Sequence, residues 1–464
     1  MKTTIIGAGG GGIASALLAA LRGEKVTLIE SHSKIGGCAS YFGRGEFVFD
    51  AGATTLSGLA PHQPLGKLFE MLGKTPAMSP VDPGIVFHLS SGKKLCYHRN
   101  FETFLKDLNR VFPDMPHRPF WELVHKVSYD AWHFLSDIES PMDMLKHPSY
   151  VALGQYLLIS TELMLKKYGL DTPAYREFVD GILLISAQEK SPHIPFLVGA
   201  MGLAYPSETF APKGGMKGLM MFFEKLLAEN GVTLQKRLPV LAVKPHELIL
   251  KGGVTHPTDR MIFNLPLWNL ATLLEDERNK AEAKKRPESW GAFTVYLGTK
   301  SMERDPYHQI HLHHPLVDNY FVSFSLLEDP DRAPEGWQSL CISTHVRVAD
   351  WYGLTDDEYE KKKRLYEQVI LEDFLKRFNI TETKFVTSGT PQTFEHYTGR
   401  TRGQVGGLPF LYGMNPLPFM KIRELGDDIY RVGDTVFPGQ GLCGVVAGAL
   451  RLHSHLTKIH PQYP

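Results

Sequence analysis

A glycine-rich turn near the N-terminus constrains the fold of this chain more than any other feature. The chain opens with MKTTIIGAGGGGIASALLAALRGEKVTLIE. β-Branched residues favour strands, whereas alanine and leucine favour helices, so the pattern predicts a strand, a helix over 13–21 and a second strand. Gly7, Gly9 and Gly12 stand across the turn in G-x-G-x-x-G spacing. Such glycines permit the tight bend, the close approach of a pyrophosphate and the packing of the helix against the strand.

An acidic residue completes this unit. Glu30 lies 18 residues after Gly12, at the end of the second predicted strand. An acid at that point can accept hydrogen bonds from the ribose hydroxyls of an adenosine, while the N-terminus of the helix attracts the phosphates. A glycine turn used only for packing would leave Glu30 unexplained. The sequence therefore predicts a dinucleotide site.

Length and composition limit the alternatives. A chain of 464 residues exceeds the size at which one hydrophobic core keeps growing, so two domains are expected. The 50 basic and 50 acidic residues balance, which gives no indication of nucleic-acid binding. We expect no transmembrane segment, because no apolar run reaches about 18 residues, and no signal or transit peptide, because the first strand starts at residue 3. The scattered cysteines indicate neither disulfides nor zinc and fit a reducing cytoplasm; they are Cys38, Cys96, Cys341 and Cys443.

Three later stretches are suited to an extended ligand. Gly36 and Gly37 follow the acid, and small residues there let the backbone pass close to a ligand. Gly214 and Gly215 precede an amphipathic helix that is followed by strand-like residues, including 240–243. Near the C-terminus, IYRVGDTVFPGQG predicts a strand over 429–432, a turn and a helix beginning near residue 442. The N-terminus of that helix would direct a second dipole at the ligand.

These motifs together resemble a known group of flavoproteins. The combination of G-x-G-x-x-G, Glu30, IGG and FDAGATT is similar to the FAD proteins shaped like amine oxidases and phytoene desaturases. GDTVFPGQG resembles their carotenoid desaturase, carotenoid isomerase and retinol saturase branch, although Cys38 stands where many relatives carry arginine. The resemblance implies FAD as cofactor. The residues that it implies for FAD binding are Gly7, Gly9, Gly12, Glu30, Gly36, Gly37, Thr54, Val240, Gly433, Asp434, Gly441, Leu442 and Val445.

The resemblance also assigns these positions to parts of the cofactor. The first turn would hold the pyrophosphate, Glu30 the adenosine ribose, and Val240 the adenine. Gly433 and Asp434 would lie beside the ribityl-phosphate, and the start of the last helix would face the flavin ring. No metal is expected, because flavin chemistry needs none.

The expected fold class is α/β. A Rossmann-like FAD-binding domain would be assembled from separated segments, and a second α+β domain with an antiparallel sheet and helices would bind the substrate. The predicted boundaries are 1–75, 213–265 and 425–464 for the FAD-binding domain, and 76–212 with 266–424 for the substrate-binding domain.

The second domain contains several patterned stretches. PFWELVHKVSYDAWHFL and VALGQYLLISTELMLKKYG predict helices with broad apolar faces, which suit either ordinary core packing or a tunnel for a long hydrophobic substrate. Residues 292–298 and 306–327 predict strands, with His311 and His313 on one face. The favoured interpretation is a sheet face beside the substrate cavity. Thr355 and Glu358 predict a capping box at the start of a helix whose basic run is a solvated face or a contact with anionic lipid.

A glycine-rich loop is the last informative stretch. HYTGRTRGQVGG interleaves Thr398, Arg400 and Arg402 with glycines. It is similar to a family segment on the substrate side of the flavin ring, which implies substrate-side positions for Thr398 and Arg400. A surface loop with solvated arginines is the alternative.

The function predicted from these features is that of an FAD-dependent oxidoreductase acting on C–C bonds of a hydrophobic polyene or isoprenoid substrate. Desaturation, saturation and cis-trans isomerisation stay open, as do the electron acceptor and the catalytic residues. An FAD-dependent amine oxidase and a non-catalytic, flavin-stabilised lipid-binding protein are the alternatives. The expected location is the cytoplasm, with peripheral contact at the inner face of a membrane left open.

Overall fold

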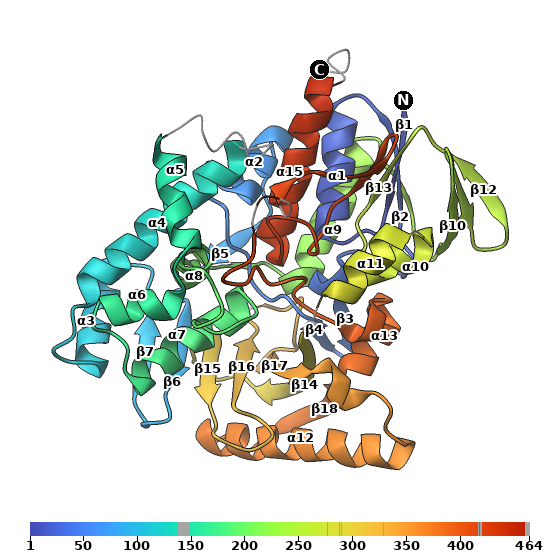
Figure 1. The fold of residues 1–464 in the computed structure, drawn as a ribbon. Helices are drawn as coiled ribbons and strands as arrows, with labels where there is room; N and C mark the ends of the chain where they lie inside the picture. Colours follow the sequence, from blue (N-terminus) through green and yellow to red (C-terminus); the bar gives the residue numbers. More distant parts are fainter. Residues whose placement is uncertain are drawn as a thin grey trace.

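Two sheets in different surroundings organise the chain (Figure 1). The computed structural model describes residues 1–137, 148–275, 277–286, 288, 290–327, 329–415, 417 and 420–459. Within these ranges no helix combines the length and apolar character needed to cross a membrane.

The first sheet has six strands from distant parts of the chain. In spatial order they are β19 (Arg423–Gly426), β20 (Ile429–Arg431), β13 (Arg260–Phe263), β1 (Lys2–Ile6), β2 (Lys25–Ile29) and β9 (Thr233–Gln235). All neighbours are parallel except β19 and β20, which are antiparallel. This is the Rossmann-like part expected from the N-terminal turn, because β1, α1 and β2 form its strand–helix–strand unit.

Four helices share one apolar core on this sheet. They are α1 (Gly10–Leu21), α2 (Pro64–Leu72), α9 (Gly215–Glu229) and α15 (Gly441–Ile459). Helix α1 begins at Gly10, earlier than the expected Ile13. The reason is close packing, since a Cβ atom on Gly12 would lie 2.0 Å from the carbonyl oxygen of Gly7. The glycines therefore form the first helical turn directly against the strand.

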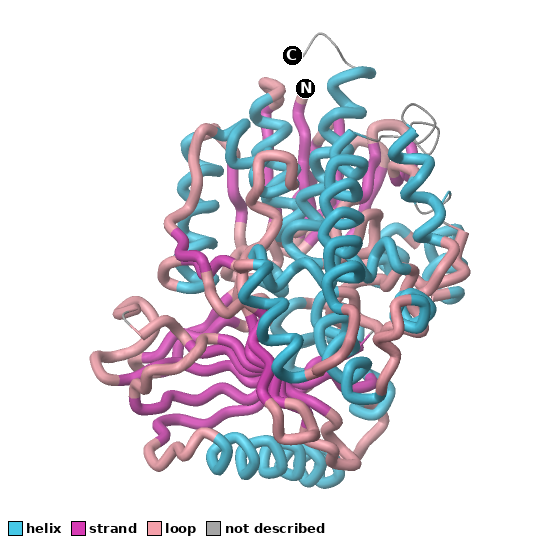
Figure 2. Tube along the Cα trace, turned by 90° about the vertical axis from the view of Figure 1, so that its left-hand side faces the viewer, coloured by secondary structure: helices cyan, strands magenta, loops and turns pink. Residues whose placement is uncertain are grey.

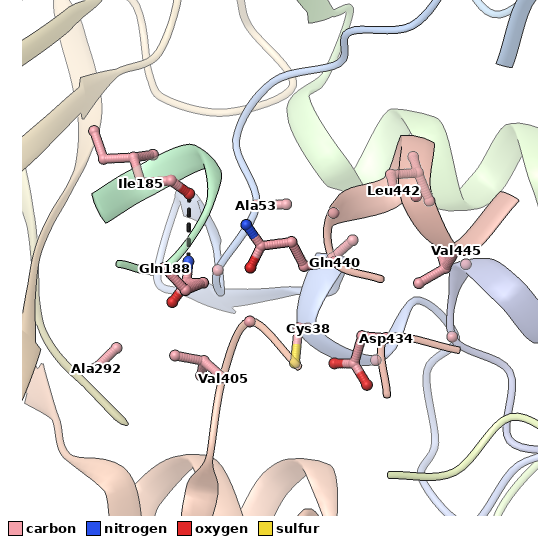
Figure 3. Close-up of a pocket in the computed structure, with 18 of the residues that line it drawn as sticks. Cys38, Ala53, Ile185, Gln188, Ala292, Val405, Asp434, Gln440, Leu442 and Val445 are labelled. Atoms are coloured by element: carbon pink, nitrogen blue, oxygen red, sulfur yellow. Dashed lines mark hydrogen bonds between the residues drawn. The ribbon is translucent and has the colours of Figure 1, made fainter. Parts of the chain in front are cut away.

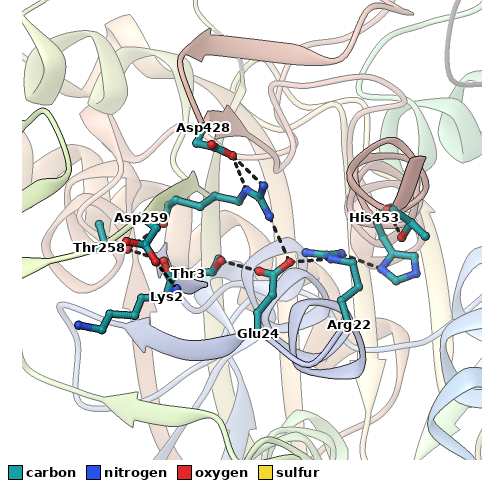
Figure 4. A network of polar contacts seen from close by, with 10 residues as sticks. Lys2, Thr3, Arg22, Glu24, Thr258, Asp259, Asp428 and His453 are labelled. Atoms are coloured by element: carbon teal, nitrogen blue, oxygen red, sulfur yellow. Dashed lines mark hydrogen bonds and ion pairs between the residues drawn. The ribbon is translucent and has the colours of Figure 1, made fainter. Parts of the chain in front are cut away.

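A buried ionic network lies at the edge where the parallel strands of this sheet begin (Figure 4). Glu24 accepts hydrogen bonds from Arg22 Nε at 2.7 Å and from Arg260 Nη1 at 3.1 Å. Arg260 also pairs with Asp428 at 2.7 Å. Arg22 Nη1 lies 2.8 Å from His453 Nδ1 of α15. The two buried arginines thus have partners, and the network connects β13 and α15 to the first strand–helix unit.

The second sheet has seven strands. In order they are β18 (Thr383–Gly389), β14 (Trp290–Lys300), β17 (Trp337–Arg347), β16 (Asn319–Phe324), β15 (Tyr307–His311), β6 (Ile85–His88) and β7 (Lys94–Tyr97). Figure 2 shows helix α12 (Asp356–Arg377) lying along one face of this sheet. The predicted capping box is confirmed, because Thr355 and Glu358 bond each other's backbone N–H groups.

The strands expected from the histidine-rich stretch are confirmed. The expectation that His311 and His313 share one face of a strand is wrong. β15 and β16 form an antiparallel pair, with His311 opposite Asn319. β15 ends at His311, and His313 adopts a left-handed backbone with a φ of 53°. The alternation of a strand therefore does not extend to His313.

A helical layer adjoins the second sheet. It consists of α3 (Phe101–Val111), α4 (His117–Asp137), α5 (Pro148–Gly154), α6 (Thr161–Lys167), α7 (Pro173–Ser186) and α8 (Phe196–Ala204). The stretch 151–169, expected to be helical, is interrupted between α5 and α6. Ser160 sets the start of α6 as its N-cap, because its side chain accepts a hydrogen bond from the Leu163 N–H.

Further short strands and helices connect these parts. They are β3 (Tyr41–Arg44), β4 (Phe47–Asp50), β5 (Met78–Pro80), β8 (Phe210–Pro212), β10 (Val240–Lys244), β11 (Glu247–Leu250), β12 (Val254–Pro257), α10 (Leu267–Leu274), α11 (Glu277–Lys285) and α13 (Pro391–Thr398). Leu270 of α10 packs with Ile29 and Phe263 of the first sheet, although it follows the predicted boundary at 265. The division of the chain into domains stays a prediction.

Candidate functional site

A cavity of about 1130 Å³ connects the first sheet, the second sheet and the helical layer. Its lining runs from Gly7 and Glu30 to Leu135 and Leu197 of the helices. Typical small-molecule sites measure about 300–1,000 Å³. The cavity is therefore slightly larger than a typical site for one small molecule.

The glycine turn forms one end of this cavity. Gly7 has a φ of 94°, which only glycine adopts readily, and Gly9 is the N-cap of α1. Both residues line the cavity, whereas Gly12 does not line it and instead packs against Gly7. The first N–H groups of a helix have no intrahelical partner. This end of the cavity is thus suited to bind an anion such as a phosphate.

Glu30 lies beside this turn, directly after β2. Its Oε2 accepts a hydrogen bond from the Ala8 N–H at 2.8 Å, and its Oε1 accepts one from the His32 N–H at 2.8 Å. The carboxylate also lines the cavity. These bonds hold an acceptor group next to the anion-binding turn, which is the arrangement that a ribose adjoining a phosphate requires.

The second glycine pair follows the same wall. Gly36 and Gly37 have φ angles of 110° and 58°, and the Gly36 N–H donates to the Ala8 carbonyl at 2.8 Å. A Cβ atom on Gly36 would lie 2.8 Å from Met220 Sδ and 2.9 Å from the Ala39 carbonyl oxygen. Thr54, farther along the chain, also lines the cavity. Glycine is therefore required where this segment crosses the turn.

The C-terminal segment brings a second helix N-terminus to the cavity. The lining includes Gly433, Asp434, Gly441, Leu442 and Val445. Helices α1 and α15 lie side by side (Figure 1) and share one core. A Cβ atom on Gly10 would lie 2.3 Å from Leu442 Cδ1, so the two helix starts are in direct contact. The N-termini of the two helices, which carry the positive ends of their dipoles, therefore lie at one region of the cavity.

Besides Gly12, Val240 is the residue of the predicted set that the cavity lining does not include. It begins β10 and packs in a small cluster with Ile29 and Phe263. The chain just before it passes close to Glu30, because the Leu238 N–H donates to the Glu30 carbonyl at 3.0 Å. A contact between Val240 and the adenine stays a prediction.

Thr398 and Arg400 both line the cavity. Arg400 Nη2 pairs with Asp434 Oδ2 at 2.8 Å, and its Nε donates to the Gln404 carbonyl at 2.6 Å. Burial raises the pKa of the nearby Cys38 thiol, and the charge of Arg400 opposes this shift. Figure 3 shows Cys38 and Asp434 side by side at the cavity. Arg400 is thus bound to the turn assigned to the cofactor, while its substrate-side role stays a prediction.

Several cavity residues were not predicted from the sequence. Asn264 follows β13, donates from Nδ2 to the Gly7 carbonyl at 3.2 Å and lines the cavity. Its position after a buried apolar strand was a usable signal, because ligands bind at the carboxyl ends of parallel strands. Gln188 and His345 also line the cavity, but they lie in stretches without a motif. Gln440 lines it too; it lies inside the motif GDTVFPGQG, although the predicted set did not include it.

The residues at this end fit a flavin dinucleotide. Two helix N-termini converge there, and Glu30 provides the acceptor expected for a ribose. In addition, Gln440 Oε1 is buried without a hydrogen-bond partner directly before α15. A buried acceptor of this kind costs about 1–3 kcal/mol unless a donor pairs with it. A ligand N–H group would supply that donor.

The opposite wall is apolar. It is formed by side chains of α4, α5, η3 (Gln155–Leu157) and α8, including Phe134, Leu135, Leu153, Leu157, Leu197, Val198 and Met201. The second sheet contributes Thr294, Gln309, Asn319, Phe321 and Ser343 to the lining. The expectation that this sheet flanks the cavity is therefore correct. The helices form a core, as one of the two interpretations expected, and they also line the cavity. A tunnel for a long hydrophobic substrate stays a prediction.

Known proteins are similar to this chain over nearly its full length. Residues 5–72 match the NAD(P)-binding Rossmann-like domain. The chloroplastic prolycopene isomerase of Daucus carota is 27% identical, over 97% of this chain and 79% of that protein. The all-trans-retinol 13,14-reductase of Rattus norvegicus is 24% identical, over 99% and 86%. These likenesses confirm the resemblance to the carotenoid isomerase and retinol saturase branch.

Solved structures show the same fold. Cyclohexylamine oxidase from Brevibacterium oxydans superposes with a TM-score of 0.65 at 14% identity, covering 99% of this chain and 98% of that one. The predicted fold class, a Rossmann-like domain with a second α+β part, is confirmed.

Proposed function

We propose that the protein is an FAD-dependent oxidoreductase acting on C–C bonds of a polyene or isoprenoid, by desaturation, saturation or cis-trans isomerisation. One observation carries the proposal: a single cavity joins the dinucleotide turn to an apolar wall of α4, α5 and α8. The named activities of the two relatives, isomerisation of prolycopene and reduction of all-trans-retinol, support the choice of substrate class.

The chain's own residues would perform binding and orientation. Gly7, Gly9 and the start of α1 would hold the pyrophosphate, Glu30 the ribose, and the start of α15 the ring. When bound, FAD supplies the exchange of a hydride with the substrate. The apolar wall excludes water and positions a C–C bond in the cavity. The predicted domain division is retained, with 1–75, 213–265 and 425–464 binding FAD.

A membrane surface is proposed as the source of the substrate. The segment 148–158 lines the cavity through Leu153 and Leu157. The same segment exposes Val151 by 53% and Leu158 by 80%. Apolar side chains that continue from a cavity wall to the surface suit peripheral contact with a bilayer. The four cysteines are all free, which supports the cytoplasmic location expected above.

An amine oxidase is the alternative enzyme, and solved amine oxidases share this fold. The specific observation against it is the long apolar wall, because a small amine does not need one. A non-catalytic lipid carrier is the other alternative. It would bind FAD and a polyene without transferring electrons between them.

Anaerobic titration of the purified flavoprotein separates these functions. We expect polyene alcohols or hydrocarbons delivered in detergent to change the flavin absorbance and to be converted, whereas amines leave the spectrum unchanged. Bleaching by amines alone would establish the amine oxidase. A bound polyene that is recovered unaltered from both the oxidised and the dithionite-reduced protein would establish the carrier.

A further inference from the structure

We infer that His345 is a catalytic acid–base residue of the proposed reaction, with Nδ1 as the atom that exchanges a proton with the substrate. The inference rests on the proposed function. His345 lies on β17, lines the cavity and pairs across the sheet with Ala292 of β14, which also lines it. Because alanine is small, the wall beside the imidazole stays open.

Three hydrogen bonds hold Gln188 next to this histidine. Gln188 Nε2 donates to the Ile185 carbonyl at 3.3 Å (Figure 3). The main-chain carbonyl of Gln188 accepts a hydrogen bond from Trp290 Nε1 at 2.9 Å. The side-chain oxygen, Gln188 Oε1, lies 3.1 Å from His345 Nε2. Gln188 has a left-handed backbone with a φ of 60°. Such a conformation is uncommon in a non-glycine residue and is concentrated at functional sites.

These bonds determine the tautomer of His345. The Ile185 carbonyl can only accept, so the amide atom facing it must be the nitrogen of Gln188. The oxygen of the same amide therefore faces His345, and Nε2 must carry the proton. In the neutral imidazole the other nitrogen, Nδ1, then has a free lone pair.

The surroundings keep this imidazole neutral. Burial alone lowers the pKa of His345 to about 4. The ionisable side chains that share the cavity wall include Asp434, paired with Arg400, and the buried Tyr296 and Cys341. Burial raises the pKa values of Tyr296 and Cys341, which keeps both groups neutral. In this neutral imidazole Nε2 is fixed as a donor, so Nδ1 is the nitrogen that can accept a proton.

The proton balance follows from the proposed reaction. In desaturation, one C–H bond of the substrate breaks and its proton goes to Nδ1. The electron pair of that bond forms the C=C bond as a hydride leaves the adjacent carbon for the flavin, which gains two electrons. Saturation would run the reverse transfers: a hydride with its two electrons would pass from reduced flavin to one carbon, and the C=C electron pair would form a C–H bond at the adjacent carbon with a proton that Nδ1 takes from solvent and passes on. Gln188 is a positioning residue, because it acts only through His345.

The tautomer is tested first, without turnover. In ¹⁵N-histidine-labelled flavoprotein near neutral pH, the His345 resonances should show a protonated Nε2 and an unprotonated Nδ1. Gln188→Met removes the acceptor, so the two tautomers should then be mixed. A proton on Nδ1 in the unsubstituted protein would overturn the inference.

Turnover is tested next, with flavin content and melting temperature measured for each variant. His345→Asn should lower kcat at least about 100-fold, since general acid–base catalysis contributes about 10²–10⁴-fold, while the substrate Kd from flavin absorbance is unchanged. His256→Asn, a β12 residue that does not line the cavity, should keep the original rate.

The outcomes are distinct. An unchanged kcat in His345→Asn overturns this inference and leaves the proposed function standing. If no polyene perturbs the flavin of the unsubstituted protein, the proposed function fails and the role of His345 fails with it.

Discussion

Single glycines determine how close the chain comes to a ligand at the first turn. Gly9 has φ and ψ of −73° and 175°, which any residue can adopt. A Cβ atom there would lie 2.9 Å from Asn264 Nδ2. A larger side chain at this position would therefore be allowed by the backbone and would occupy the cavity end that suits a pyrophosphate.

Gly9→Val is expected to lower FAD affinity by at least about tenfold, which corresponds to about 1.4 kcal/mol. The branched side chain would fill the space of the phosphates, while the helix and strand persist. The ratio of flavin to protein absorbance after purification, with a titration of added FAD, measures the effect.

Gly92→Asn is the matched control for this prediction. Gly92 has a φ of 79°, and a Cβ atom there meets nothing within 4 Å. Asparagine tolerates this backbone, and the position does not line the cavity. Full flavin retention in Gly9→Val would show that the pyrophosphate binds elsewhere.

At the scale of elements, the segment α5–η3 joins the cavity to the surface. Replacing Val151 and Leu158 by serine should weaken partitioning into phosphatidylcholine–phosphatidylglycerol vesicles, measured by co-sedimentation, by at least about 100-fold, because each large apolar side chain contributes about 1.5–3 kcal/mol when buried and about 1.4 kcal/mol is a factor of ten. Turnover of a detergent-solubilised substrate should be unchanged.

Two exposed apolar residues on the three-stranded sheet of β10, β11 and β12 provide the control. Leu241 of β10 and Val254 of β12 are 58% and 59% exposed and do not line the cavity. The Leu241→Ser and Val254→Ser double variant should bind vesicles like the unsubstituted protein. Equal loss in both double variants would mean that the contact is non-specific.

At the scale of the whole molecule, burial of histidines makes stability depend on pH. Burial lowers the pKa of His88 to about 3 and the pKa values of His125, His308, His345 and His453 to about 4. Unfolding returns each of them to about 6.5. Below that pH the unfolded chain binds more protons than the folded one, so stability is present above about pH 6.5 and is lost as the pH falls toward 4.

A single histidine of this kind should lower the free energy of unfolding by about 2 kcal/mol between about pH 7 and about pH 5. Urea denaturation across this range measures the slope. His125→Gln should give a shallower slope, since one proton-binding difference is removed. His193→Gln, at an exposed position, should keep the original slope. A pH-independent midpoint would contradict the prediction.

The local motifs could be predicted from the sequence because glycine turns and helix caps depend on residues that are close together in the chain. The strand–glycine–helix unit, the capping box at Thr355 and the α15 start were all predicted from neighbouring residues. The interruption at Ser160 was missed because helical periodicity on both sides concealed a cap. The face expected for His313 was wrong because strand alternation ends where the pairing ends.

The amino-acid sequence by itself determined the Rossmann-like unit and the resemblance to a flavoprotein branch, since glycine spacing, an acid at fixed separation and helix starts act over short distances. Only the tertiary structure decided that Asn264, Gln188 and His345 share one cavity with Gly7. The reason is that such proximity depends on strand register and on packing between segments more than a hundred residues apart, for which no local pattern exists.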